Sequence, residues 1–124
     1  MPEIDLKNRT KNFAHRCVKP ALSLNHGSLS KHIQNQLIRS ATFIASNYRA
    51  ACLARSKAEF VSKISISLEE ADETCFWMEF IADEKLINKK KREKLLAEGK
   101  ELTAILIKSR KTVKNRASEF NEKF

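Results

Sequence analysis

The chain has 124 residues, enough for one domain with a hydrophobic core and too few for a second domain of ordinary size. Hydrophobic residues make up 42% of it and the net charge is +9, a composition that argues against disorder and favours an acidic partner such as nucleic acid. No apolar run approaches the roughly 20 residues that span a bilayer. The first thirteen residues lack the apolar core of a signal peptide, so we expect a cytoplasmic protein.

The first predicted helix covers about residues 5–19. Asp5 fits the N-cap position, and Phe13 and Cys17 fall on one face at helical spacing together with Leu6. Pro20 is expected to end or kink this helix, because proline lacks a backbone N–H and its ring clashes with the preceding turn. The stretch NHGS that follows is the clearest loop in the chain.

The second predicted helix covers about residues 28–53 and contains no acidic residue. Its apolar positions step by three and four along a narrow seam: Leu29, Ile33, Leu37, Ala41, Ile44 and Tyr48. Ser40 and Asn47 flank that seam, whereas Arg39 and Arg49 point away from it. These polar side chains therefore do not converge on one site.

The third predicted helix covers about residues 57–82 and begins with a capping box formed by Ser56 and Glu59. Its main seam consists of Phe60, Ile64, Leu68, Ala71, Cys75, Met78 and Ala82. A second apolar group lies roughly opposite: Ile66, Trp77, Phe80 and Ile81. Because a helix that is apolar on two faces must bury both, we expect a further helix or subunit to cover the second group.

The fourth predicted helix covers about residues 89–114, and we expect the tail, residues 115–124, to fray. Its seam consists of Leu95, Gly99, Leu102, Ile105, Leu106 and Val113, with Ser109 among them. Leu96 and Ile107 lie off the seam and offer apolar surface to a partner. No stretch alternates convincingly with the period of a strand. The short connections then predict an all-α, antiparallel up-down-up-down four-helix bundle, a single domain spanning residues 1–124.

No group of residues has the spacing of a catalytic or metal site. The three cysteines are far apart and are interpreted as small residues in or near the core. The Glu-x-x-His motif of bundle metal sites is absent, and none of the three histidines stands beside a nucleophile. We therefore predict a nonenzymatic protein with no catalytic residue, metal or cofactor.

The arginines of the second helix could meet the acids of the third. Arg39 and Arg49 with Glu69, Glu70 and Glu73 could form an acid/base site, but arginine does not lose its proton near neutral pH. Charge pairing between helices or subunits is the preferred interpretation, and ligand contact is the alternative. The predicted contact residues are Arg39, Asn47, Arg49, Ile66, Glu69, Glu73, Trp77, Phe80 and Ile81.

Basic side chains on the fourth helix are the candidates for phosphate contacts. They are Lys89, Lys90, Lys91, Arg92, Lys100, Lys108, Lys111 and Lys114. With one Trp and one Tyr, the chain has little capacity for base stacking, so we expect weak sequence specificity. The alternative is a purely structural or protein-binding module in which the charge provides only solubility.

The order and spacing of residues in the second and third helices resemble those of a known bacterial family. The motif runs Gln36-Leu37-x-Arg39-Ser40-Ala41-x-x-Ile44-Ala45-x-Asn47-Tyr48-Arg49, then Arg55-Ser56-Lys57-x-Glu59-Phe60, then Glu69-Glu70-Ala71-x-Glu73-Thr74 with Trp77. It is similar to the four-helix-bundle proteins encoded in intervening sequences of large-subunit ribosomal RNA. Pro20 departs from that pattern, since it lies where the first helix of the family usually continues.

The resemblance implies a cytosolic protein that assembles into a ring-like homopentamer and has no known catalytic activity. The accessory proteins of diversity-generating retroelements look like relatives; they are basic pentamers that bind nucleic acid and partner with a reverse transcriptase. RNA or DNA and a reverse transcriptase are therefore candidate partners implied by the resemblance, and no membrane is. The resemblance does not identify the natural ligand.

Overall fold

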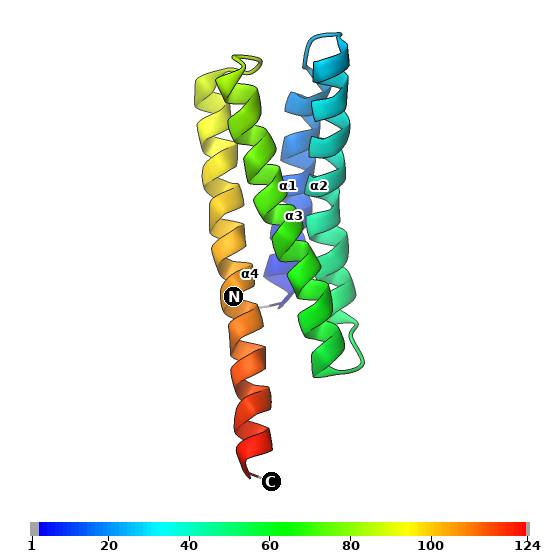
Figure 1. The fold of residues 1–124 in the computed structure, drawn as a ribbon, viewed down its shortest axis with the longest axis vertical. Helices are drawn as coiled ribbons and strands as arrows, with labels where there is room; N and C mark the ends of the chain where they lie inside the picture. Colours follow the sequence, from blue (N-terminus) through cyan, green and yellow to red (C-terminus); the bar gives the residue numbers. More distant parts are fainter. Residues whose placement is uncertain (1–2, 124) are drawn as a thin grey trace.

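The computed structural model describes the backbone of residues 3–123 and the side chains of residues 5–116. Four helices follow one another: α1 (Glu3–Leu22), α2 (Ser28–Cys52), α3 (Lys57–Asp83) and α4 (Lys89–Lys123). Connections of four or five residues join them, so each helix runs antiparallel to the one before it (Figure 1). Residues 3–123 contain no strand, and the predicted all-α four-helix bundle is confirmed.

The core follows the apolar seams of α1 and α2 closely. Phe13 and Cys17 of α1 are buried, as are Leu37 and Ile44 of α2. Leu29 is an exception, because it lies in the first turn of α2 at the end of the bundle and is exposed, while the neighbouring Ser30 is buried.

The seam of α3 differs from the prediction. Its buried residues are Ile64, Ser67, Ala71, Thr74, Cys75, Met78 and Ile81, whereas Phe60, Leu68 and Ala82 are half-buried. Ser67 donates a hydrogen bond to the carbonyl of Ile44 at 2.8 Å, and the hydroxyls of Thr74 and Ser40 lie 2.9 Å apart. Since these hydroxyls have partners across the α2–α3 interface, their burial leaves no unsatisfied polar group. Ile81, predicted on the second apolar face, belongs to the core.

The ends of α1 differ from the prediction. The helix begins at Glu3, so Asp5 lies within its first turn and is not the N-cap. It also continues through Pro20 to Leu22. Because Pro20 stands in the last turn, its missing N–H removes a single helical hydrogen bond. At the end of the helix, Ser23 donates its hydroxyl to the carbonyl of Pro20 at 2.7 Å and its backbone N–H to the carbonyl of Lys19 at 3.1 Å.

At the other end of the chain, α4 is longer than predicted. It runs to Lys123 and not to residue 114, since neither glycine nor proline follows Gly99 to interrupt it. Its last turns project beyond the other helices (Figure 1). The side chains of residues 117–124 lie outside the described residues.

The start of α3 and the apolar residues of α4 that lie off its seam can also be compared with the prediction. Ser56 accepts a hydrogen bond from the backbone N–H of Glu59 at 3.0 Å, which is one of the two hydrogen bonds of the predicted capping box. Leu96, predicted to lie off the seam of α4, is buried beside Leu95, because α4 packs against both α3 and α1. Ile107 is 45% exposed, as expected for a residue off the seam.

Gly99 of α4 lies in close contact with side chains of both α1 and α3. A Cβ atom there would lie 2.9 Å from Sγ of Cys75 and 3.2 Å from Cζ of Phe13. Both neighbours are buried, so neither can move aside without disturbing the core.

We expect Gly99→Val to lower the free energy of unfolding by about 2 kcal/mol, because overpacking forces buried neighbours out of their rotamers. Ala97→Val is the matched control: it adds a β-branched residue at an exposed position one turn or less away on α4. Thermal melts at equal protein concentration should show a clear fall for Gly99→Val alone. Equal melting temperatures for the two variants would mean that the contact among the three helices is not tight.

Candidate functional site

Arg39 forms a charge clamp between α2 and α3, defined here as Arg39 with Glu70 and Glu73. Nη1 of Arg39 lies 3.1 Å from Oε1 of Glu70, and Nη2 lies 2.5 Å from Oε2 of Glu73. Trp77 donates its indole N–H to Glu73 at 3.3 Å, and the guanidinium of Arg39 lies 5.5 Å from the ring centre of Phe43. The contact is therefore made within one subunit, across two neighbouring helices.

The protonation of the α2–α3 clamp suits a structural contact. Burial by itself would raise the pKa of Glu73. The hydrogen bonds from Arg39 and Trp77 act in the opposite direction and lower the pKa, and on balance it lies below its ordinary value. The hydrogen bonds to Glu73 and Glu70 raise the pKa of Arg39. Because the pKa shifts of Arg39 and Glu73 both favour the charged forms, this pair offers neither a general acid nor a general base near neutral pH.

A second charge clamp, Arg9 with Glu98 and Glu101, joins α1 to α4. Arg9 donates two hydrogen bonds to the carboxylate of Glu98, at 3.0 and 2.6 Å, and lies 3.0 Å from Glu101. These hydrogen bonds raise the pKa of Arg9. This clamp was not predicted from the sequence. It has the same pattern as the α2–α3 clamp, because in both an arginine lies opposite two glutamates spaced by three residues on an antiparallel helix.

Three other predicted contact residues lie elsewhere. Asn47 donates its side-chain amide to the carbonyl of Phe43, within its own helix, at 2.9 Å. Arg49 is exposed on the side of α2 that faces α1, and among the described side chains no carboxylate lies within 4.0 Å of it. Glu69 is exposed as well. The structure therefore does not bring Arg49 and Glu69 into the α2–α3 clamp.

An aromatic face, defined as Phe76, Trp77 and Phe80 of α3, lies beside the α2–α3 clamp. The ring centres of Phe76 and Trp77 are 4.9 Å apart, and those of Trp77 and Phe80 are 5.9 Å apart. His32 of α2 packs edge-on against Trp77. Trp77 and Phe80 are half-buried, but Phe76 is 51% exposed and was missed from the sequence, although it stands four residues before Phe80. Ile66, at 36%, is exposed farther along α3.

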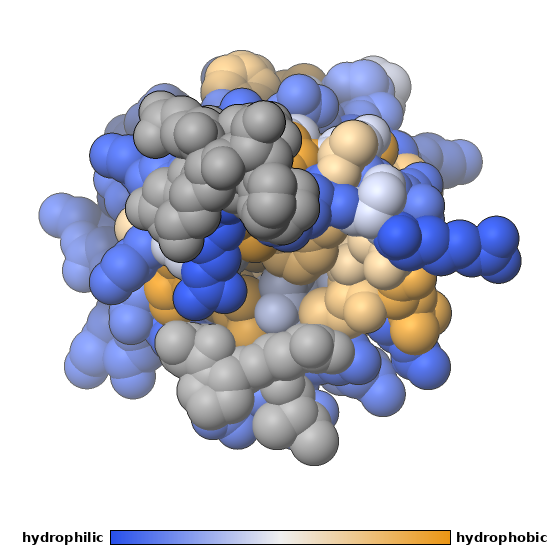
Figure 2. All heavy atoms as spheres, turned by 90° about the horizontal axis from the view of Figure 1, so that it is seen from below, coloured by the Kyte–Doolittle hydropathy of each residue, from blue (hydrophilic) through white to orange (hydrophobic). Residues whose placement is uncertain are grey.

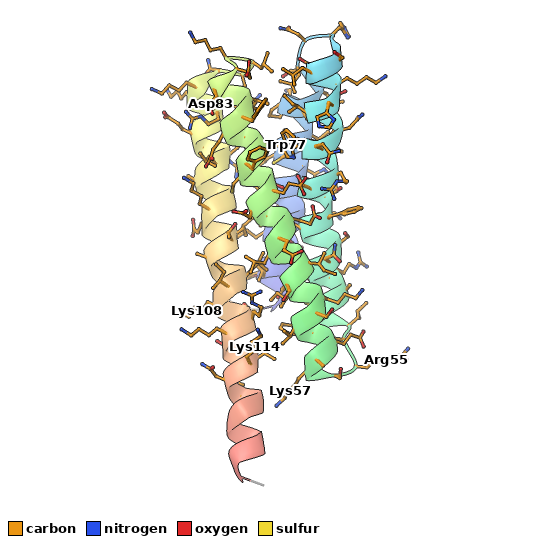
Figure 3. All side chains as sticks on the ribbon, in the orientation of Figure 1. Arg55, Lys57, Trp77, Asp83, Lys108 and Lys114 are labelled. Carbon is orange, nitrogen blue, oxygen red and sulfur yellow. The ribbon has the colours of Figure 1, made fainter. Side chains whose placement is uncertain are left out.

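The predicted phosphate-contacting residues of α4 do not form one patch. Lys91 lines a groove beside α1, while Lys100 approaches Glu79 of α3 at 3.9 Å. Lys108 and Lys114 lie on the lower half of α4, far from Trp77 on the upper half of α3 (Figure 3). At 1.5 Å per residue, Lys91 and Lys108 are about 25 Å apart along the helix. Lys89, Lys90 and Lys111 are exposed, and Arg92 is half-buried.

Cys17 and Cys75 are buried. Burial raises the pKa of the Cys17 thiol to about 12 and also raises that of Cys75, so neither forms a thiolate readily. Within the part of the chain that the structure describes, no cluster of three His, Cys, Asp or Glu side chains could hold a metal ion. In the same part, no helix combines the length and apolar character that a membrane span needs.

We expect Arg39→Gln to destabilise the fold by about 1 kcal/mol, because it leaves two half-buried carboxylates without their charged partner. Arg49→Gln is the matched control, since it removes the same charge from an exposed position on the same helix and should change stability by less than about 0.5 kcal/mol. Urea unfolding at neutral pH measures both. Equal losses would show that net charge, and not the clamp, determines the effect.

Acid should weaken the α2–α3 clamp. The pKa of Glu73 is lowered from 4.5, so its contribution to stability is complete above that pH and is lost as the pH falls through the lowered value. Urea unfolding between about pH 7 and pH 3 should therefore show the difference between wild type and Arg39→Gln shrinking below pH 4.5. A difference that persists undiminished to the acid end would mean that Arg39 acts by packing on Phe43.

The comparisons with known proteins agree with this fold. The family model for the 23S rRNA-intervening sequence protein matches residues 3–108. A crystal structure of a protein of unknown function from the S23 ribosomal protein family of Bacteroides thetaiotaomicron VPI-5482 is 30% identical, with a TM-score of 0.79. The match covers 90% of this chain and 99% of that one. No curated protein matches. The chain belongs to the family of 23S rRNA-intervening sequence proteins.

Proposed function

We propose that the chain is a nonenzymatic, homo-oligomeric scaffold of the cytoplasm that binds nucleic acid or a nucleoprotein. The observation that carries this proposal is the use of charge inside the bundle. Each clamp joins one arginine to two glutamates, so together they engage four of the fifteen acidic side chains and two of the 24 basic ones. In the rest of the chain, basic side chains outnumber acidic ones, and this excess of positive charge attracts polyanions through counterion release.

The aromatic face supports self-association. Phe76 exposes half of its surface next to two half-buried aromatic rings, and exposed apolar surface of this kind is typical of a protein interface. Seen from its lower end, the bundle is largely hydrophilic around its outline, with apolar surface between the polar side chains (Figure 2). A pentamer is the assembly implied by the resemblance to ring-forming relatives. On the same ground, a reverse transcriptase is a candidate protein partner.

Phe76→Asp should dissociate the oligomer while leaving the helices intact, because the side chain is exposed in one subunit and a charge cannot be buried cheaply between two. Leu53→Asp is the matched control, since Leu53 is 73% exposed and lies away from the aromatic face, after the end of α2. Light scattering on a size-exclusion column gives the mass, and circular dichroism checks the helices. An unchanged mass for Phe76→Asp would remove the aromatic face from the interface.

Nucleic-acid binding is tested with fluorescently labelled single-stranded RNA and DNA of mixed sequence. We expect the wild type to bind both in low salt and the logarithm of the affinity to fall linearly with the logarithm of the salt concentration. Fluorescence anisotropy measures the affinity, and an uncharged peptide nucleic acid of the same sequence is the control. If no charged strand binds even at low salt, the alternative of a structural or protein-binding module is the correct one.

A further inference from the structure

A long segment that covers most of α1 and all of α2 has no carboxylate side chain. Between Leu6 and Ala58 the chain contains no aspartate or glutamate, although it contains ten lysines and arginines. Both clamps therefore draw their acids from α3 and α4. The basic side chains on the outer side of the α1–α2 contact come from this acid-free segment.

A groove of about 510 Å³ lies at this place, lined only by α1 and α2. Lys7, Lys11 and His15 line it from α1, and Arg49 lines it from α2. Its other lining residues are Asn8, Ala14, Val18, Thr42, Ala45 and Ser46, and none of these described residues is acidic. The groove has the size of a ligand site and a wall of positive charge.

The groove favours anions through its cations. The hydroxyl of Thr42 donates to the carbonyl of Ile38 in its own helix at 2.8 Å, so it is not a free donor for a ligand. Ala14 and Ala45 are small, which leaves room for an oxygen-bearing group to reach the basic side chains around them. His15 is the one aromatic ring among the lining residues, so the groove has little means of stacking several bases.

A second groove, of about 330 Å³, lies between α1 and α4. His15 lines both grooves, and Arg16, Lys19, Lys91 and Lys94 add four positive charges in the second. The lining residues of this groove, all of them described, again include no acid. Lys7 and Lys19 are twelve residues apart on α1, which corresponds to about 18 Å.

We infer that this basic track, defined as Lys7, Lys11, His15, Arg16, Lys19, Arg49, Lys91 and Lys94, binds the phosphodiester backbone of a nucleic acid strand. The inference rests on the proposed function and names the surface that performs it. Two grooves that share His15 fit a row of phosphates better than a single phosphate, because their charges are spread along α1. Its position accounts for Arg49, which the α2–α3 clamp does not use.

The track is a better phosphate site than the lysines on the lower half of α4, called the stripe here and defined as Lys108, Lys111 and Lys114. Lys108, Lys111 and Lys114 are exposed on a single convex helix surface. In the track, side chains of three helices surround concave surface, so a bound phosphate can meet more than one cation at once.

The test compares two triple variants that remove the same charge. Lys11, Arg49 and Lys94 are changed to Gln in the track variant, and Lys108, Lys111 and Lys114 are changed to Gln in the stripe variant. All six residues are exposed, so both proteins should fold, and circular dichroism and thermal melts check this. Binding of a labelled single-stranded RNA of mixed sequence is measured by anisotropy against salt concentration, with adenosine monophosphate as a competitor.

We expect the track variant to bind at least about tenfold more weakly at 0.1 M salt and its salt slope to fall by about 2, since each single-strand phosphate contact contributes about 0.7. The stripe variant should lose less than about threefold. Equal losses, or a larger loss for the stripe variant, would overturn the inference and leave the proposed function intact. The same holds if adenosine monophosphate binds as tightly as the strand, since the site would then accept a mononucleotide. A wild type that binds no strand would overturn the proposed function itself.

Discussion

The separation of charge between the two helical hairpins is the constraint on which this structure depends. Because the chain carries no acid from Leu6 to Ala58, the carboxylates that pair with Arg9 and Arg39 belong to α3 and α4. The two clamps use that arrangement: Arg39 faces α3 and Arg9 faces α4. Among the side chains that the structure describes, no ion pair joins α1 to α2; apolar residues pack between them, and basic residues line their outer groove.

The clamps contribute more to the choice of partner helix than to the free energy of folding. The side chains of Arg39 and Glu73 are each about one-third exposed, and ion pairs in such surroundings typically add about 1 kcal/mol or less. An arginine opposite two glutamates spaced by three residues nevertheless favours one antiparallel neighbour and one register, because like charges oppose the alternatives. The stability itself comes from the apolar core and from close contacts such as that at Gly99.

The fold could be predicted from the sequence because the seams of α1 and α2 are local patterns. The buried face of α3 was predicted incorrectly at positions where burial depends on a hydrogen-bond partner. Ser67 and Thr74 are buried because Ile44 and Ser40 of α2 supply their hydrogen bonds. Hydropathy along one helix contains no information on such partners. The basic residues of α4 were recognised for the same local reason, whereas the track was not. It becomes visible only when helices from three parts of the chain lie side by side.

The positions of the two arginines of α2 make self-association and strand binding compatible. Arg39 and Arg49 are ten residues apart, which turns their side chains about 80° from each other around the helix. Arg39 lies beside the aromatic face on α3, and Arg49 lies in the groove with α1. The aromatic face and that groove therefore lie on different sides of α2, so burial of the aromatic face does not by itself cover the groove of the same subunit. An assembly would present one track per copy, and a strand long enough to reach two tracks would bind far more tightly than a short one, because its second contact is intramolecular.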